Sequence, residues 1–100
     1  MLNQIVLVGR LTENPTVEKL EEGKEVATVT LAVQRSMKNA DGEYETDFVP
    51  CRLWNSIATN TADYCKKGDI VGVKGRIQST DGNLEIIAEK VTFLSSKKED

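Results

Sequence analysis

Several residue types that carry chemistry are absent or scarce in this chain of 100 residues. It has no histidine and only two cysteines, Cys51 and Cys65. Histidine is the commonest general base, so Ser-His and Cys-His catalysis are impossible within the chain. Without histidine or a Cys-x-x-Cys pair a zinc site is disfavoured, and we expect both cysteines to be buried, reduced thiols. The sequence therefore predicts no enzyme, no metal and no cofactor.

Long hydrophobic runs and glycine-rich phosphate loops are also missing. No segment approaches the roughly 18 apolar residues of a membrane helix, and the glycines do not form a GxGxxG pattern, so we expect neither a membrane nor a small-molecule substrate as partner. The first residues, MLNQ, lack the basic region of a secretory signal, which predicts a cytoplasmic protein. The length suits one domain over residues 1–95, with a short polar tail at 96–100.

The formal net charge is small and negative, −3, which by itself argues mildly against a nucleic-acid partner. The acidic residues concentrate in three segments: 13–25, 41–47 and the last two residues. Cations cluster between these segments, at the ends of expected strands. A locally basic groove on an acidic protein is therefore still possible.

Five segments have the alternating, β-branched pattern of strands: 4–11, 25–36, 43–54, 69–78 and 84–94. Between the third and fourth, the apolar spacing becomes helical, and we expect a helix over 56–67 with Tyr64 and Cys65 on its buried stripe. Lys66 and Lys67 would then lie at its C-terminal dipole. This order predicts an all-β, five-stranded OB-fold barrel with one helix between strands three and four.

Individual residues refine this fold. Gly9 inside the first strand indicates a bend or a close backbone approach, and Pro50 indicates a bulge or an edge position. Asp81-Gly82 fits a tight two-residue turn, which leaves no length for a projecting arm. The first strand is apolar on both faces, so its edge would suit pairing with a second copy of the chain.

Residue parity in segment 43–54 separates a core face from a candidate binding face. Val49, Cys51 and Leu53 form a small apolar set, which places Phe48, Arg52 and Trp54 on the opposite face. An OB barrel binds mainly across its second and third strands, and aromatic rings there can stack on the bases of any single strand. Arg52 could contact phosphate or stack through its guanidinium plane. The alternative is that both aromatic rings belong to the core.

Other residues are more ambiguous. Lys74 and Arg76, outward on segment 69–78, could line the same groove or could be solvated surface charges. Lys67 could bind a phosphate or could belong to the helix end. Tyr64 and Phe93 follow apolar stripes and are assigned to the core, whereas the spacing does not decide the role of Tyr44.

A family resemblance is visible in five quoted segments: NQIVLVGRL at 3–11 with Pro15 after it, VATVTLAV at 26–33, Asp47-Phe48-Val49 leading to Trp54, YCKKG at 64–68 and VKGRIQ at 73–78. In this order and spacing the chain resembles bacterial single-stranded-DNA-binding proteins. It is most similar to the short forms of low-GC Gram-positive bacteria and of their phages and mobile elements.

The resemblance implies a tetramer of OB domains wrapped by single-stranded DNA, acting in replication, recombination and repair, with a dimer as the alternative assembly. Phe48 and Trp54 fall at base-stacking positions, Met37 stands where some members carry a stacking tryptophan, and Glu18 stands where many carry arginine. The candidate DNA-binding residues are in all Phe48, Trp54, Arg52, Arg10, Arg35, Met37, Lys38, Lys74, Arg76 and Lys67.

Two departures from the family pattern affect what we expect. The loop at 79–83 is short where relatives have a long basic hairpin, which predicts a smaller occluded site and weaker binding. The chain ends in KKED without the acidic Pro-Phe tip that recruits partners in relatives, so partners that dock on that tip are not expected to bind. The competing interpretations are a primosomal accessory OB protein that works mainly through protein contacts, an enzyme domain, and a purely structural OB module.

Overall fold

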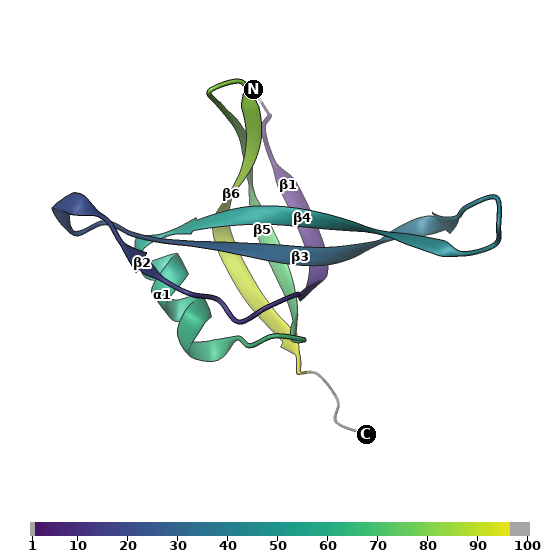
Figure 1. The fold of residues 1–100 in the computed structure, drawn as a ribbon, viewed down its shortest axis with the longest axis horizontal. Helices are drawn as coiled ribbons and strands as arrows, with labels where there is room; N and C mark the ends of the chain where they lie inside the picture. Colours follow the sequence, from purple (N-terminus) through teal and green to yellow (C-terminus); the bar gives the residue numbers. More distant parts are fainter. Residues whose placement is uncertain (1, 97–100) are drawn as a thin grey trace.

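Strands dominate the computed structural model, which describes residues 2–96 (Figure 1). The elements are, in chain order, β1 (Ile5–Leu11), β2 (Glu18–Lys19), the 3₁₀ turn η1 (Glu21–Gly23), β3 (Glu25–Lys38), β4 (Tyr44–Trp54), α1 (Asn55–Tyr64), β5 (Ile70–Thr80) and β6 (Asn83–Ser95). Of the predicted polar tail, residues 97–100 lie outside the described part.

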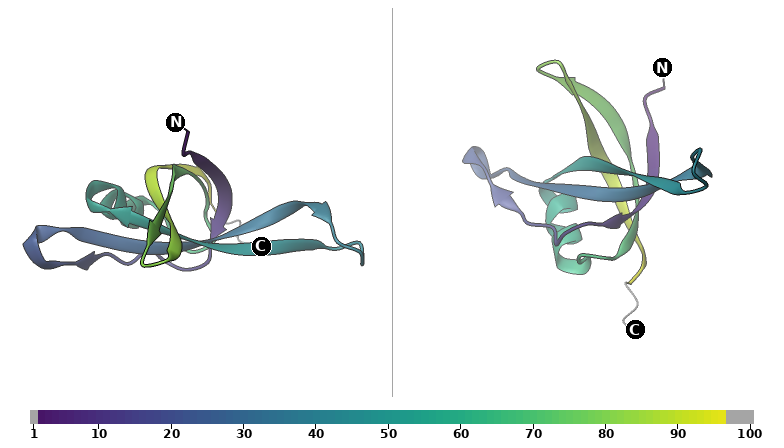
Figure 2. Two further views of the ribbon diagram at one scale, coloured as in Figure 1. Left: turned by 90° about the horizontal axis from the view of Figure 1, so that it is seen from above. Right: turned by 45° about the vertical axis from the view of Figure 1, so that its right-hand side comes forward.

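The five long strands close into a barrel. Neighbouring strands follow the order β1-β5-β6-β4-β3-β2, and β1 returns to pair with β3 through Arg10↔Ala32 and Leu11↔Leu31. The two-residue β2 adds to the outer edge of β3. With β2 left out of the count, α1 lies between the third and fourth long strands, which confirms the predicted OB-fold barrel. The two views in Figure 2 show β3 and β4 as one long ribbon across the barrel.

The core lies where alternate residues of the strands point inward. Leu31 and Leu53 are completely buried, and Cys51 and Cys65 are buried and free, as predicted. Burial raises the pKa of the Cys51 thiol to about 11, so this thiol is protonated at neutral pH. The helix α1 packs against the barrel through Ala58 and Thr61.

Glycine permits the barrel to close tightly at two positions. A Cβ added at Gly9 would lie 2.9 Å from the carbonyl oxygen of Ala32, which confirms the predicted close backbone approach. A Cβ at Gly75 would lie 2.1 Å from the carbonyl oxygen of Ile87, beside a register shift between Lys74 and Gly75. Both contacts are with backbone, which cannot move without shifting a neighbouring strand.

The helix is shorter than predicted, and two aromatic assignments were wrong. It ends at Tyr64, so Lys66 and Lys67 lie in the turn after it and not in its last turn. Tyr64 is 78% exposed, because the buried stripe runs through Ala58, Thr61 and Cys65 and a residue adjacent to Cys65 points about 100° away. Phe93 is 47% exposed, since every residue of β6 after Val91 lies beyond the core.

The turn between β5 and β6 is as tight as predicted, but a projecting hairpin exists. Asp81 and Gly82 have φ angles of 51° and 82°, as a two-residue turn of mirror-image type requires. The strands themselves continue past the core to Thr80 and Asn83 and project at the top of Figure 1. The prediction that the short loop leaves no length for a projecting hairpin was therefore wrong, and Ile77 is 40% exposed in this hairpin.

Pro50 lies in continuous register with Thr30 of β3, without a bulge. On its other side β4 pairs with β6 only at Cys51 and Arg52. The sequence predicted a bulge or an edge position for Pro50, and the structure places it at a locally unpaired edge.

Candidate nucleic-acid interface

The outer face of β3 and β4 carries a row of even-numbered β4 residues. Trp54 lies opposite Val26, which lies opposite Glu18 of β2. Phe48 lies opposite Ala32, which lies opposite Arg10 of β1. Phe48 is 67% exposed and Trp54 is half-buried, so both rings are accessible on the face that parity predicted and neither belongs to the core.

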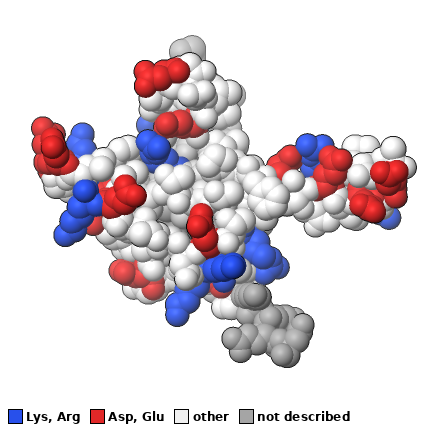
Figure 3. All heavy atoms as spheres, in the orientation of Figure 1, with Lys and Arg blue, Asp and Glu red and all other residues white. Residues whose placement is uncertain are grey.

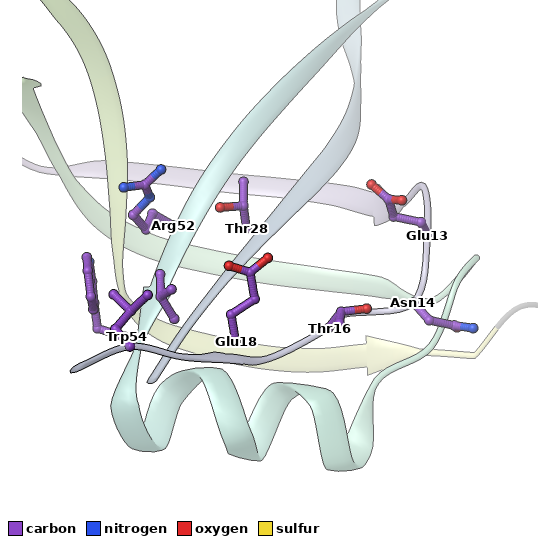
Figure 4. A pocket seen from close by; sticks show the side chains of 9 residues that line it. Glu13, Asn14, Thr16, Glu18, Thr28, Arg52 and Trp54 are labelled. Carbon is purple, nitrogen blue, oxygen red and sulfur yellow. The ribbon is translucent and has the colours of Figure 1, made fainter. Parts of the chain in front are cut away.

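Two hollows open around Arg52 on this face. The first has a volume of about 370 Å³ and lies between Trp54 and the segment from Glu13 to Leu20; it is shown in Figure 4. The second, of about 170 Å³, is lined by Pro50 and Arg52 on one side and Leu84 to Ile86 on the other. Thr28 and Arg52 line both, so the two hollows adjoin, and together we call them the groove, which reaches from Trp54 to Leu84 on the β5–β6 hairpin.

Carboxylates accompany Arg52 in this groove and Arg76 on the strand beyond β6. Arg52 Nη1 lies 3.7 Å from Glu85 Oε1, and Arg76 Nη1 lies 3.5 Å from Glu89 Oε2. Ile87 of β6 pairs with both arginines, so Arg76 lies only two strands away from Arg52. These pairs are partly exposed, and each arginine can exchange its carboxylate for a phosphate at a modest cost.

Lys74 lies apart from this groove. It is opposite Val6 of β1 on the outer face, and the register shift after it separates it from Arg76. The structure thus brings Arg76 close to Arg52 but places Lys74 beside the apolar residues of β1.

A third hollow continues the row of Phe48 and Arg10. It has a volume of about 310 Å³ and lies between the end of β1 and the turn that follows α1, where Lys67 and Gly68 form its other wall. Arg10 Nη1 donates a hydrogen bond to the Gly68 carbonyl oxygen, at 2.6 Å, and the Lys67 amide donates to Asn14 Oδ1, at 2.8 Å. The first bond holds the Arg10 guanidinium against the turn that carries Lys67, and both predicted cations line this hollow at one end of the aromatic face.

The far part of the β3–β4 ribbon, residues 33–47, projects from the barrel, and we call it the arm. Arg35 donates two hydrogen bonds to Asp47 and also pairs with Glu45. The carboxylates raise the pKa of Arg35, and the guanidinium lowers the pKa of Asp47. Met37 is 80% exposed and lines a hollow with Arg35 and Glu45. Arg35 and Met37 therefore lie with acidic side chains and not with Phe48.

Tyr44 is the residue whose role the sequence left undecided. It is 49% exposed, opposite Lys38, and the Lys38 Nζ lies 5.6 Å from the centre of its ring. It shares the even parity of Phe48 and Trp54, and β4 has no irregularity of its own between them. Following the alternation of β4 back from Phe48 by four residues would have identified Tyr44 as a third ring on this face.

The charge distribution on this face is uneven. In Figure 3 the middle of the face is mostly uncharged, acidic side chains cover both ends of the β3–β4 ribbon, and basic side chains gather along the lower edge. Within residues 2–96, no group of three or more possible metal ligands occurs, and no helix is long and apolar enough to cross a membrane.

Comparisons with known proteins agree with this architecture. Residues 2–94 match the model of the family described as "Single-strand binding protein family". Single-stranded DNA-binding protein B of Bacillus subtilis is 48% identical, over 97% of this chain and 94% of that protein. Single-stranded DNA-binding protein 1 of Clostridium acetobutylicum is 43% identical, over 98% of each chain.

The structural comparison gives the same result. The crystal structure of the wild-type single-stranded DNA binding protein from Thermus aquaticus superposes with a TM-score of 0.80 at 26% identity. The match covers 94% of this chain and 50% of that one. The chain thus belongs to the single-strand binding protein family, as its resemblance to Gram-positive members implied, and is a binding protein and not an enzyme.

Proposed function

We propose that the chain binds single-stranded DNA without sequence specificity, by base stacking and phosphate neutralisation, in the cytoplasm, and serves replication, recombination and repair. The observation that carries this proposal is the pair of accessible rings, Phe48 and Trp54, on one outer face with Arg52 between them. Every base has a π-face, so rings in this arrangement bind single strands of any sequence. The names of the relatives support the same ligand.

The geometry suggests how a strand would lie. Phe48 and Trp54 are six residues apart on β4, or about 20 Å at the rise of a strand. Bases would stack on the two rings, and phosphates would meet Arg52 and Arg76 at one end and Arg10 and Lys67 at the other. Because Arg52 and Arg76 already have carboxylate partners, a phosphate contact at either must displace one, and affinity should be moderate.

The test is to replace each ring and measure binding of a fluorescently labelled oligo-dT by anisotropy. Phe48→Ala and Trp54→Ala should each weaken binding by roughly 1–3 kcal/mol, the scale of base–aromatic stacking. Tyr64→Ala is the matched control, because this ring is 78% exposed on α1 and lies off the face. Normal binding by a folded double variant, Phe48→Ala with Trp54→Ala, would overturn the proposal.

We expect this function to be carried by an oligomer, a tetramer rather than a dimer. Along Ile5–Gly9 the strand β1 pairs with β5 on one side, and its pairing with β3 involves only Arg10 and Leu11 among the described residues. Val6 and Val8 are 68% and 55% exposed on the same strand. An unpaired apolar edge is most simply covered by a second copy through two-fold symmetry. A monomer found by light scattering at micromolar concentration would contradict this expectation.

One observation favours the primosomal accessory alternative. The carboxylates beside Arg35, Arg52 and Arg76 oppose DNA, as would be acceptable in a protein that works through protein contacts. DNA affinity distinguishes the two functions. If oligo-dT does not bind even at low salt, where electrostatic attraction is strongest, the accessory role is the better assignment.

A further inference from the structure

The hollow beside Trp54 differs in chemistry from the rest of the face. Its walls combine an aromatic ring and apolar side chains with two carboxylates, those of Glu13 and Glu18. Its one cation, Arg52, is drawn toward Glu85 on the neighbouring strand. These carboxylates make the hollow itself less favourable for phosphate than the rest of the face, where Arg52 can still be reached from its other side. At about 370 Å³ the hollow nevertheless lies within the size range of small-molecule pockets, so it suits a planar, uncharged group.

Glu18 is placed to contact such a group at its edge. It lies in the same cross-strand row as Trp54, with Val26 between them, so the two residues stand about two strand spacings, or ~10 Å, apart. Figure 4 shows its carboxylate pointing into the hollow, between Trp54 and Glu13 and toward Thr28. An ionised carboxylate only accepts hydrogen bonds, so it selects a ligand with N–H donors at its edge.

We propose that this hollow holds one nucleobase stacked on Trp54, and that Glu18 makes it favour bases with an exocyclic amino group over thymine. Cytosine presents the two N–H donors of its N4 amino group, a group that acidic side chains accept from in DNA recognition. Thymine presents carbonyl oxygens on both sides of its single N–H, and these oxygens are repelled by the carboxylate. The inference rests on the proposed function and adds a preference at one position.

The experiment compares oligo-dC with oligo-dT of equal length, because both bases are pyrimidines of the same ring size. We expect the affinity ratio, dC over dT, to fall about threefold to tenfold in Glu18→Gln, the range for one hydrogen bond in a partly exposed site. The amide of Gln can donate as well as accept, so it serves either base. General repulsion between Glu18 and phosphates cancels in the ratio, because both oligomers carry the same phosphates.

Glu21→Gln is the matched control, since it removes one negative charge from the neighbouring turn η1 and does not line the hollow. Its ratio should equal that of the wild type. Glu18→Ala should lower the ratio in the same direction as Glu18→Gln. An unchanged ratio in both Glu18 variants, with normal binding of each oligomer, would overturn this inference and leave the proposed function intact. Failure of the wild type to bind either oligomer would instead overturn the proposed function.

Discussion

The two parts of the β3–β4 ribbon are built in different ways. In the central part, residues 26–32 and 48–54, alternate side chains such as Val29, Leu31 and Leu53 are buried in the barrel. In the arm, residues 33–47, no residue is fully buried, and the strands are held by ladder hydrogen bonds and by the Arg35 ion pairs. The same two strands thus pass from a packed barrel wall to a projection into solvent (Figure 1).

This difference determines how precisely each part presents its rings. Beneath Phe48 and Trp54, the core side chains fix the strand, so the outer side chains have a defined direction. In the arm the register shifts between Gln34 and Lys38, and no core corrects it. Tyr44 is therefore held mainly by Lys38 and by its own strand, and we expect it to be ordered by binding more than Phe48 is.

The largest expected effect is on the free energy of unfolding. It tests whether the core stabilises the central part of the β3–β4 ribbon and not the arm. Leu53→Ala should destabilise the protein by about 2–5 kcal/mol, because it leaves a cavity at a fully buried position. Arg35→Ala should cost less than about 1 kcal/mol, because its ion pairs are exposed to solvent. Urea denaturation of the two variants measures both values. Equal losses would mean that the arm is as important for stability as the barrel.

The next effect tests Tyr44 as a contact at the end of the arm. Tyr44→Ala should weaken binding of an oligo-dT of about 16 nucleotides by roughly 1 kcal/mol, the lower end of the stacking scale. It should not affect an oligomer of about 4 nucleotides, which covers only the central part. Tyr64→Ala again serves as control. If both lengths are weakened equally, the ring acts on the fold of the ribbon and not on the DNA.

The smallest effect concerns the ion pairs of Arg35 with Asp47 and Glu45, which we call the Arg35 clamp. Asp47→Asn should free one side of the guanidinium for phosphate while Glu45 still pairs with the other. Affinity should rise a few-fold, and the salt dependence should steepen by at most about 0.7 per phosphate gained. Asp41→Asn removes the same charge from the arm, but Asp41 is not a partner of Arg35. Affinities measured across a salt series separate the two variants. Identical slopes would show that only the net charge of the arm matters.

The wild-type clamp should respond to acid in a defined direction. Arg35 lowers the pKa of Asp47, so the pair contributes above the ordinary carboxyl pKa and is lost as the pH falls through the lowered value. At neutral pH the clamp is closed, which is the state that DNA encounters.

Much of the fold could be predicted because its signals are local. Alternation in the third long strand identified the buried positions of Cys51 and Leu53 and the outer positions of Phe48 and Trp54. The Asp81-Gly82 turn was identified from residue types that tolerate positive φ. Two core assignments were wrong for different reasons. Tyr64 points away from the buried stripe of α1, and Phe93 belongs to apolar residues that continue past the last packed layer, where periodicity cannot show that packing ends.

The candidate site was only partly predictable for a related reason. Parity placed Arg52 between the two rings, but the carboxylates near it and near Arg76 come from β6, far along the chain. The hollow beside Trp54 forms only because β2 adds to the edge of β3 and brings Glu18 into the row of Trp54. Tyr44 carried a usable signal in its parity, which the acidic residues around it obscured.

By itself the sequence determined which side chains of each strand face inward, because the period of a strand is set by the geometry of consecutive residues. The sequence also excluded histidine chemistry, and it determined which aromatic rings are available for stacking on bases. Only the tertiary structure decided which strands are neighbours, and hence which arginine meets which carboxylate and where the face is hollowed. Those contacts join residues distant in the chain, and their register is set by closure of the whole barrel around one core.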